Sequence, residues 1–154
     1  MNPRSIRKVV LDTNVVLDWL LYEDPSVASL RAALEAKRVL MMIDALTCAE
    51  LKRVLSYAKL RLESAQQADI LARYEAFGIQ AELPDGFGRA SLQLPKDFPV
   101  CSDRDDQHLL ALAFHAKADA LLTRDKAVLR LRKRAARFGV MIASPSENIE
   151  AREF

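Results

Sequence analysis

Short apolar runs alternate along this chain with stretches whose apolar residues recur at helical spacing. The runs at residues 8–11, 39–43 and 120–123 are aliphatic and have the length of buried strands. Each is followed by a segment with the period of an amphipathic helix. Because strands that alternate with helices form parallel sheets covered on both sides, this order predicts an α/β protein. We expect three layers, α/β/α, around a central, mostly parallel sheet.

The same patterns place the individual elements. A long stretch at residues 78–100 contains prolines and glycines without a clean period, and we expect an irregular connection there. The expected helices are residues 13–21, 26–37, 45–57, 63–77, 103–117 and 126–138, and a last short strand is expected at 140–142.

Length and composition predict one self-sufficient domain. A chain of 154 residues fits one domain, 1–154, whose core we place at about residues 7–146. Folding at this length buries roughly 70% of the accessible surface, so no disulfide or structural metal is needed. The chain is 51% hydrophobic and 29% charged, which is typical of a globular protein and argues against disorder or a membrane span. Residues 1–8 lack the features of a signal peptide, and we expect a cytoplasmic protein.

The cysteines and histidines do not have the spacing of a zinc site. Cys48 and Cys101 are expected to be reduced thiols. His108 and His115 lie seven residues apart on one expected helix and are interpreted as packing or surface residues.

Three aspartates occupy places where α/β proteins carry their chemistry. Asp12 and Asp125 follow strands, and Asp106 lies in the first turn of an expected helix. The carboxyl ends of parallel strands and the starts of the following helices meet at one edge of such a sheet. We therefore expect these side chains to face a common crevice.

Two further positions bear on this acidic set. Asp103, Asp105 and Asp106 lie close together in the chain. Only Asp106 continues the apolar helical stripe that includes Leu109, so we favour Asp106 as the residue that faces the crevice, and Asp105 stays open as the alternative. Asp103 is expected to cap the helix and to support the site. Glu50 flanks the apolar stripe of its own helix and is expected to reach the crevice.

A meeting of four carboxylates requires a counterion. At about 6 Å apart and an effective dielectric of about 20, each pair repels by roughly 3 kcal/mol, ~17 kcal/mol in all. Such a sum exceeds the stability of a typical domain, about 5 to 15 kcal/mol. An all-oxygen ligand set suits Mg²⁺ or Mn²⁺ rather than zinc. These ions activate water and stabilise charge on a phosphate, which favours phosphodiester hydrolysis as the reaction.

A basic stretch follows Asp125. Residues 124–137 hold seven Lys or Arg against one acid, a net charge of +6, although the whole chain carries only +2. Such a patch is typical of binding to a phosphate backbone, although a solvated helix face would have the same composition. The expected RNA-binding residues are Arg124, Lys126, Arg130, Arg132, Lys133 and Arg134.

Five segments together resemble the PIN-domain nucleases, in particular the PIN-type toxins of toxin-antitoxin systems. Residues 9–14 (VVLDTN) resemble the opening strand with its Asp-Thr-Asn signature, and 49–51 (AEL) the second acid. Residues 101–106 and 109–113 resemble the helix of the third acid, and 121–125 (LLTRD) the strand of the fourth. Each motif is weak alone, but their joint order is specific.

The resemblance implies a function and a ligand set. The chain would be a Mg²⁺- or Mn²⁺-dependent endoribonuclease, inhibited by a small antitoxin protein and associating as a homodimer. The implied catalytic metal ligands are Asp12, Glu50, Asp106 and Asp125. The implied supporting residues are Asn14 and Thr123.

Other interpretations of the same residues stay open. Asp12 and Asp125 could only cap the helices that follow them, and Glu50 could pair with Arg53 or Lys52 on its own helix. The chain could also be a catalytically inactive PIN fold that binds RNA or protein. A nucleotide-binding fold is disfavoured because no glycine-rich loop follows the first strand. An aspartyl phosphotransferase is disfavoured because Asn14 stands where its second aspartate is expected.

Overall fold

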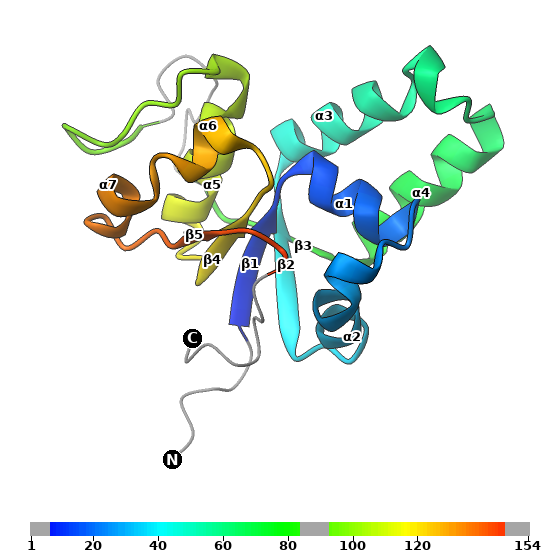
Figure 1. Cartoon of the computed structure of the whole chain (residues 1–154), viewed down its shortest axis with the longest axis horizontal. Coiled ribbons are helices and arrows are strands. Elements are labelled where there is room, and N and C mark those ends of the chain that lie inside the picture. The colour runs from blue at the N-terminus through cyan, green and yellow to red at the C-terminus, as the bar shows by residue number, and fades with distance from the viewer. Residues whose placement is uncertain (1–6, 84–92, 147–154) are drawn as a thin grey trace.

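The computed structural model describes residues 7–83 and 93–146, and its centre is a five-stranded, all-parallel sheet (Figure 1). The strand order is β3-β2-β1-β4-β5. The sheet confirms the predicted fold class. The strands are β1 (Arg7–Leu11), β2 (Val39–Ile43), β3 (Gly78–Gln80), β4 (Ala120–Leu122) and β5 (Ile142–Ala143).

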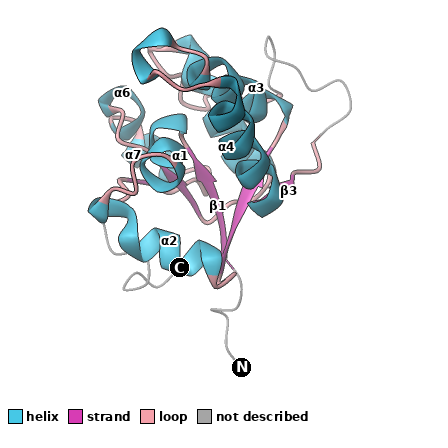
Figure 2. Cartoon of the chain, turned by 90° about the vertical axis from the view of Figure 1, so that its right-hand side faces the viewer, coloured by secondary structure: helices cyan, strands magenta, loops and turns pink. Residues whose placement is uncertain are grey.

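Helices cover both faces of this sheet, as Figures 1 and 2 show. The first four helices pack on one face and the last three on the other, which gives three layers. The α-helices are α1 (Thr13–Leu20), α2 (Ala28–Glu35), α3 (Ala45–Leu55), α4 (Ser64–Phe77), α5 (Gln107–His115), α6 (Lys126–Leu129) and α7 (Arg132–Ala136). Short 3₁₀ helices are η1 (Pro25–Val27), η2 (Ala58–Leu60) and η3 (Arg104–Asp106).

The strand β1 contributes to both halves of the core. Val9 and Leu11 belong to the apolar cluster beneath α1–α4, whereas Val10 belongs to the cluster beneath α5–α7. Successive side chains of a strand point to opposite faces, so a strand covered on both sides is apolar at every position. This double burial explains the continuous apolar runs in the sequence.

The structure corrects three predicted elements. The strand β3 lies within the segment expected to be irregular, because its exposed Ile79 and Gln80 leave no apolar run and only pairing with β2 defines it. The expected helix 126–138 is broken near Leu131, whose N–H bonds the carbonyl of Val128 in a tight turn. The last strand begins at Ile142 rather than residue 140, since the N–H of Val140 bonds Ala135 and closes α7.

Two of the predicted segments include residues that the structure does not describe. Residues 84–92 of the expected irregular connection lie outside the described residues, as do both ends of the proposed single domain, 1–6 and 147–154.

Gly78 permits the close packing of β3 on β2. A Cβ at this position would lie 2.3 Å from Cδ1 and 2.8 Å from Cγ1 of the buried Ile43. We predict that Gly78→Ala lowers the free energy of unfolding by about 1 to 3 kcal/mol, the usual cost of overpacking, measured by urea denaturation.

A double variant separates this clash from a general effect of the substitution. Ile43→Val removes the Cδ1 atom and alone costs about 0.5 to 1.5 kcal/mol. Combined with Gly78→Ala, it should cost less than the sum of the two changes. Strict additivity would show that Ile43 is not what excludes a side chain at residue 78.

Candidate functional site

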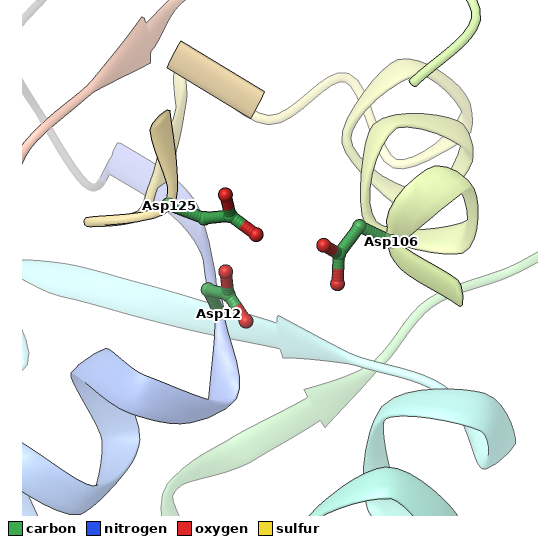
Figure 3. Close-up of side chains that lie close together, drawn as sticks. All are labelled: Asp12, Asp106 and Asp125. Atoms are coloured by element: carbon green, nitrogen blue, oxygen red, sulfur yellow. The ribbon is translucent and has the colours of Figure 1, made fainter. Parts of the chain in front are cut away.

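Three aspartates meet at the carboxyl edge of the sheet (Figure 3). One carboxylate oxygen each from Asp12, Asp106 and Asp125 lies within 4.8 Å of the others. They come from the ends of β1 and β4 and from the start of α5, as the sequence predicted. The side chains point toward one another in the close-up, so they enclose one small space.

Neighbouring strands bring two of the three together. β1 and β4 pair in parallel with Leu11 opposite Leu122, and the N–H of Asp12 donates to the carbonyl of Leu122 at 3.0 Å. The chain turns into a helix directly after each strand, which leaves Asp12 and Asp125 at the sheet edge. The strand order also reverses between β1 and β4, and such a switch point opens a crevice for ligands in α/β sheets.

Thr123 joins the two strand-end aspartates. Its hydroxyl donates to Oδ2 of Asp12 at 2.7 Å and accepts from the N–H of Asp125 at 3.0 Å. The residue is completely buried. Thr123 therefore sets the position of Asp12 relative to the turn that carries Asp125.

Asp12 and Asp125 cap helices and also converge on one site. Oδ1 of Asp12 accepts from the N–H of Thr13 at 2.7 Å, and Oδ1 of Asp125 accepts from the N–H of Ala127 at 2.9 Å. Each aspartate thus caps a helix with one oxygen. These bonds fix the carboxylates in orientation, so capping and a site are not exclusive here.

The electrostatics show the cost of this arrangement. Burial, above all, raises the pKa of Asp106 to about 8, and its hydrogen bond with Asp125 and the charges of Asp12 and Asp103 add to the rise. Burial also raises the pKa of Asp12, against the hydrogen bonds from Thr123 and Thr13. Without a cation, the group therefore retains a proton at neutral pH.

The other predicted acids lie outside this group. Glu50 on α3 pairs with Arg53, the alternative that the sequence left open, with 2.5 Å between Oε1 and Nη2. Asp105 is exposed. Asp103 caps η3 by accepting from the N–H of Asp105 at 3.0 Å. Of the two candidates for the third ligand, Asp106 is thus the one that meets Asp12 and Asp125.

Asn14 lies close to Asp12 in the chain. It lies in the first turn of α1, two residues from Asp12, and its Oδ1 is buried with no hydrogen-bond partner among the described residues. An acceptor of this kind is costly to bury unless something binds it. The three carboxylates make an all-oxygen donor set that fits Mg²⁺ or Mn²⁺. A thiolate- or imidazole-bound ion such as zinc has no matching ligands in the group.

Sequence reasoning missed Gln107. Its Oε1 accepts from the N–H of Cys101 at 2.7 Å, and its Nε2 donates to the carbonyl of Pro99 at 3.1 Å. These bonds hold the segment before η3 against the start of α5, which carries Asp106. A glutamine directly after a possible ligand has no distinctive pattern, so only the structure reveals the role.

The basic stretch is less uniform than the sequence suggested. Arg124 forms an ion pair with the buried Asp18 of α1, with 3.1 Å between Nε and Oδ2, and so its charge is compensated. Nε of Arg132 donates to the carbonyl of Ile142 at 2.9 Å. The remaining predicted RNA-binding residues are exposed, and they are Lys126, Arg130, Lys133 and Arg134.

The thiols and the first histidine are packing groups. Cys48 and Cys101 are free, as expected, and burial raises the pKa of both thiols. His108 is buried. Among the described residues, no helix has both the length and the apolar character to cross a membrane.

The structure is thus a parallel α/β/α sheet with three carboxylates gathered at its switch point. A family model described as PIN domain matches residues 8–127, and the chain belongs to this family, whose members are nucleases. This match confirms the resemblance seen in the sequence.

Comparison with solved structures supports the same fold. The crystal structure of VapBC2 from Rickettsia felis bound to a DNA fragment from their promoter is similar to this chain, with a TM-score of 0.59. The similarity covers 89% of this chain and 98% of that chain, at 16% sequence identity. No curated protein matches the chain.

Proposed function

We propose that this protein is an endoribonuclease that hydrolyses RNA phosphodiester bonds with Mg²⁺ or Mn²⁺. The observation that carries the proposal is the convergence of Asp12, Asp106 and Asp125 within 4.8 Å. Three carboxylates at this separation are stable as charged groups only beside a cation. The membership of the PIN domain family supports a nuclease.

The residues of this chain would have different roles in the proposed reaction. Asp12, Asp106 and Asp125 would hold the cation, Thr123 and Asn14 would keep the ligands and a water in place, and Glu50 would join from α3. Asp103 and Asp105 support the turn that presents Asp106. A bound divalent ion lowers the pKa of a water and stabilises the charge that develops on the phosphate.

Exposed cations beyond the crevice would bind the RNA strand. Lys126 follows Asp125 directly, and Arg130, Lys133 and Arg134 extend this surface over α6 and α7. Each phosphate neutralised by such a residue releases counterions, so binding is expected to weaken steeply with salt. Arg124 and Arg132 would contribute less, because each already has a partner within the chain.

One similar structure supports a proposal for the biological role. The similar Rickettsia felis structure is a VapBC2 complex, which supports a toxin held by a small antitoxin protein. We propose that this chain acts as such a toxin in the cytoplasm, where cellular RNA is found, and that it forms a homodimer.

One experiment tests the proposed reaction. Chelator-treated protein should leave a labelled single-stranded RNA intact, and added Mg²⁺ or Mn²⁺ should restore cleavage. Because water and not the 2′-hydroxyl is the nucleophile, the fragments should carry no 2′,3′-cyclic phosphate, which separates them from the products of metal-independent ribonucleases.

Two results would contradict the proposal. Cleavage that persists in chelator would point to a contaminant or another mechanism. Salt-sensitive RNA binding without any turnover in Mg²⁺ or Mn²⁺ would favour an inactive PIN fold that serves as a binding module.

A further inference from the structure

Arg53 is held in place by two side chains near it in the chain, Glu50 and Tyr57. On α3 its Nη2 lies 2.5 Å from Oε1 of Glu50, its Nη1 donates to the hydroxyl of Tyr57, and its guanidinium lies 5.7 Å from the centre of the Tyr57 ring. The side chain is still 53% exposed. These two bonds use two of the five donors of a guanidinium, and a guanidinium held beside an aromatic ring is a geometry that binds phosphate.

Arg53 is carried on α3, which packs against both α1 and α5, the helices that begin beside Asp12 and Asp106. The hydrogen bond and charge of Glu50 raise the pKa of Arg53, and Asp105 on η3 adds to this rise. Glu50 in turn raises the pKa of Asp12, so its carboxylate acts on the three-aspartate group from outside it. The guanidinium therefore stabilises the charge of Glu50, which the three aspartates repel.

The pair between Glu50 and Arg53 is easily exchanged. Its side chains are 23% and 53% exposed and stand three residues apart on one helix. Exposed pairs of this kind contribute little to stability, because water and salt screen them. A divalent cation beside Asp12 attracts the carboxylate of Glu50 more strongly than one guanidinium does, since it carries twice the charge.

We propose that Arg53 binds substrate: it holds Glu50 while the metal site is empty and turns to an RNA phosphate once Glu50 joins the cation. This inference rests on the proposed function. Release of Glu50 leaves the charge of the guanidinium without this partner, while Tyr57 still holds the side chain. Its planar donors then match two phosphate oxygens. Metal binding and RNA binding consequently strengthen one another.

The effect of Arg53 on metal binding can be measured without catalysis. Arg53→Gln removes the competitor for Glu50, so Mn²⁺ should bind the variant about 2- to 10-fold more tightly than the wild type, measured by calorimetry on chelator-treated protein. Lys52→Gln is the matched control, because it removes the same charge from an exposed position on the same helix. It should change Mn²⁺ affinity less than 2-fold.

The effect on RNA binding is measured with an oligonucleotide that remains intact after exhaustive digestion by the protein. In fluorescence anisotropy, Arg53→Gln should bind it about 10-fold more weakly than wild type in Mn²⁺ and with equal affinity in chelator. Lys52→Gln should behave alike under both conditions. In a Glu50→Gln background, the gain in Mn²⁺ affinity caused by Arg53→Gln should disappear.

The outcomes separate this inference from the proposed function. If wild-type protein binds Mn²⁺ and cleaves RNA but Arg53→Gln matches Lys52→Gln in both assays, the exchange is disproved and the nuclease stands. If the wild type binds no Mn²⁺, the proposed function fails first.

Discussion

Asp12→Asn is expected to lower the rate of metal-dependent RNA cleavage by about 10²- to 10⁴-fold, the effect of losing several kcal/mol of charge stabilisation at the phosphate. Asp12 is the buried member of the group, and both of its oxygens are oriented by hydrogen bonds. An amide of the same shape cannot supply the negative charge that holds a cation. The measurement is the initial rate on a labelled RNA in saturating Mg²⁺.

The fold should survive this change. Asparagine retains an oxygen that accepts from the N–H of Thr13, so the cap of α1 is preserved. Burial raises the pKa of Asp12, and an uncharged side chain relieves that cost. Circular dichroism should therefore match the wild type. Asp69→Asn, on the exposed side of α4, is the control and should retain full activity. An Asp12→Asn protein that cleaves at more than a tenth of the wild-type rate would refute the role of this carboxylate.

Asp106→Asn should abolish cleavage and at the same time stabilise the metal-free protein at alkaline pH. The folded protein holds the proton of Asp106 up to a pKa of about 8, against 3.8 for the free group. The folded state therefore binds more protons than the unfolded state between these values, and its stability falls as pH rises through this window. The variant has no such group to ionise and should lack this fall.

The size of the effect can be bounded. The side chain is only half-buried, so we expect a gain of about 1 to 2 kcal/mol at pH 8, which corresponds to a rise in Tm of roughly 2 to 6 °C. At pH 5 the difference should be smaller, because the wild-type carboxyl is still protonated. Thermal unfolding at both pH values, with and without Mg²⁺, provides the measurement.

A neighbouring acid supplies the control for this comparison. Asp105→Asn changes an exposed carboxylate in the same turn and should leave the dependence of Tm on pH and on Mg²⁺ as in the wild type. Mg²⁺ should raise the Tm of the wild type most at pH 8 and leave that of Asp106→Asn almost unchanged. If Asp105→Asn gave the larger effect, the third ligand would be Asp105.

Local patterns predicted the fold well where burial dictates the residues. β1 and β2 are covered on both faces, so their aliphatic runs reveal them, and the helices that follow have regular apolar stripes. β3 escaped prediction because a short edge strand with exposed side chains has no pattern of its own. The break at Leu131 escaped because Val128, Leu131 and Ala135 keep helical spacing through the tight turn.

The contacts of the site also divide into those that the sequence predicted and those that it did not. Asp12 and Asp125 were predictable because a residue that follows a buried parallel strand must emerge at the sheet edge. The pairing of Arg124 with Asp18 was not, since these residues lie 106 positions apart and meet only when α1 packs beside the turn after β4. Glu50 shows the limit most clearly, because the sequence allowed either the crevice or a pair with Arg53 and only the structure shows the pair.

The amino-acid sequence by itself determined the alternation of strands and helices and the placement of acids after them, because burial and capping act on neighbouring residues. Only the tertiary structure decided which carboxylates meet, which basic side chains pair with an acid and which neighbour Glu50 binds. These outcomes depend on distances between segments far apart in the chain, and such distances exist only once the sheet has brought those segments together.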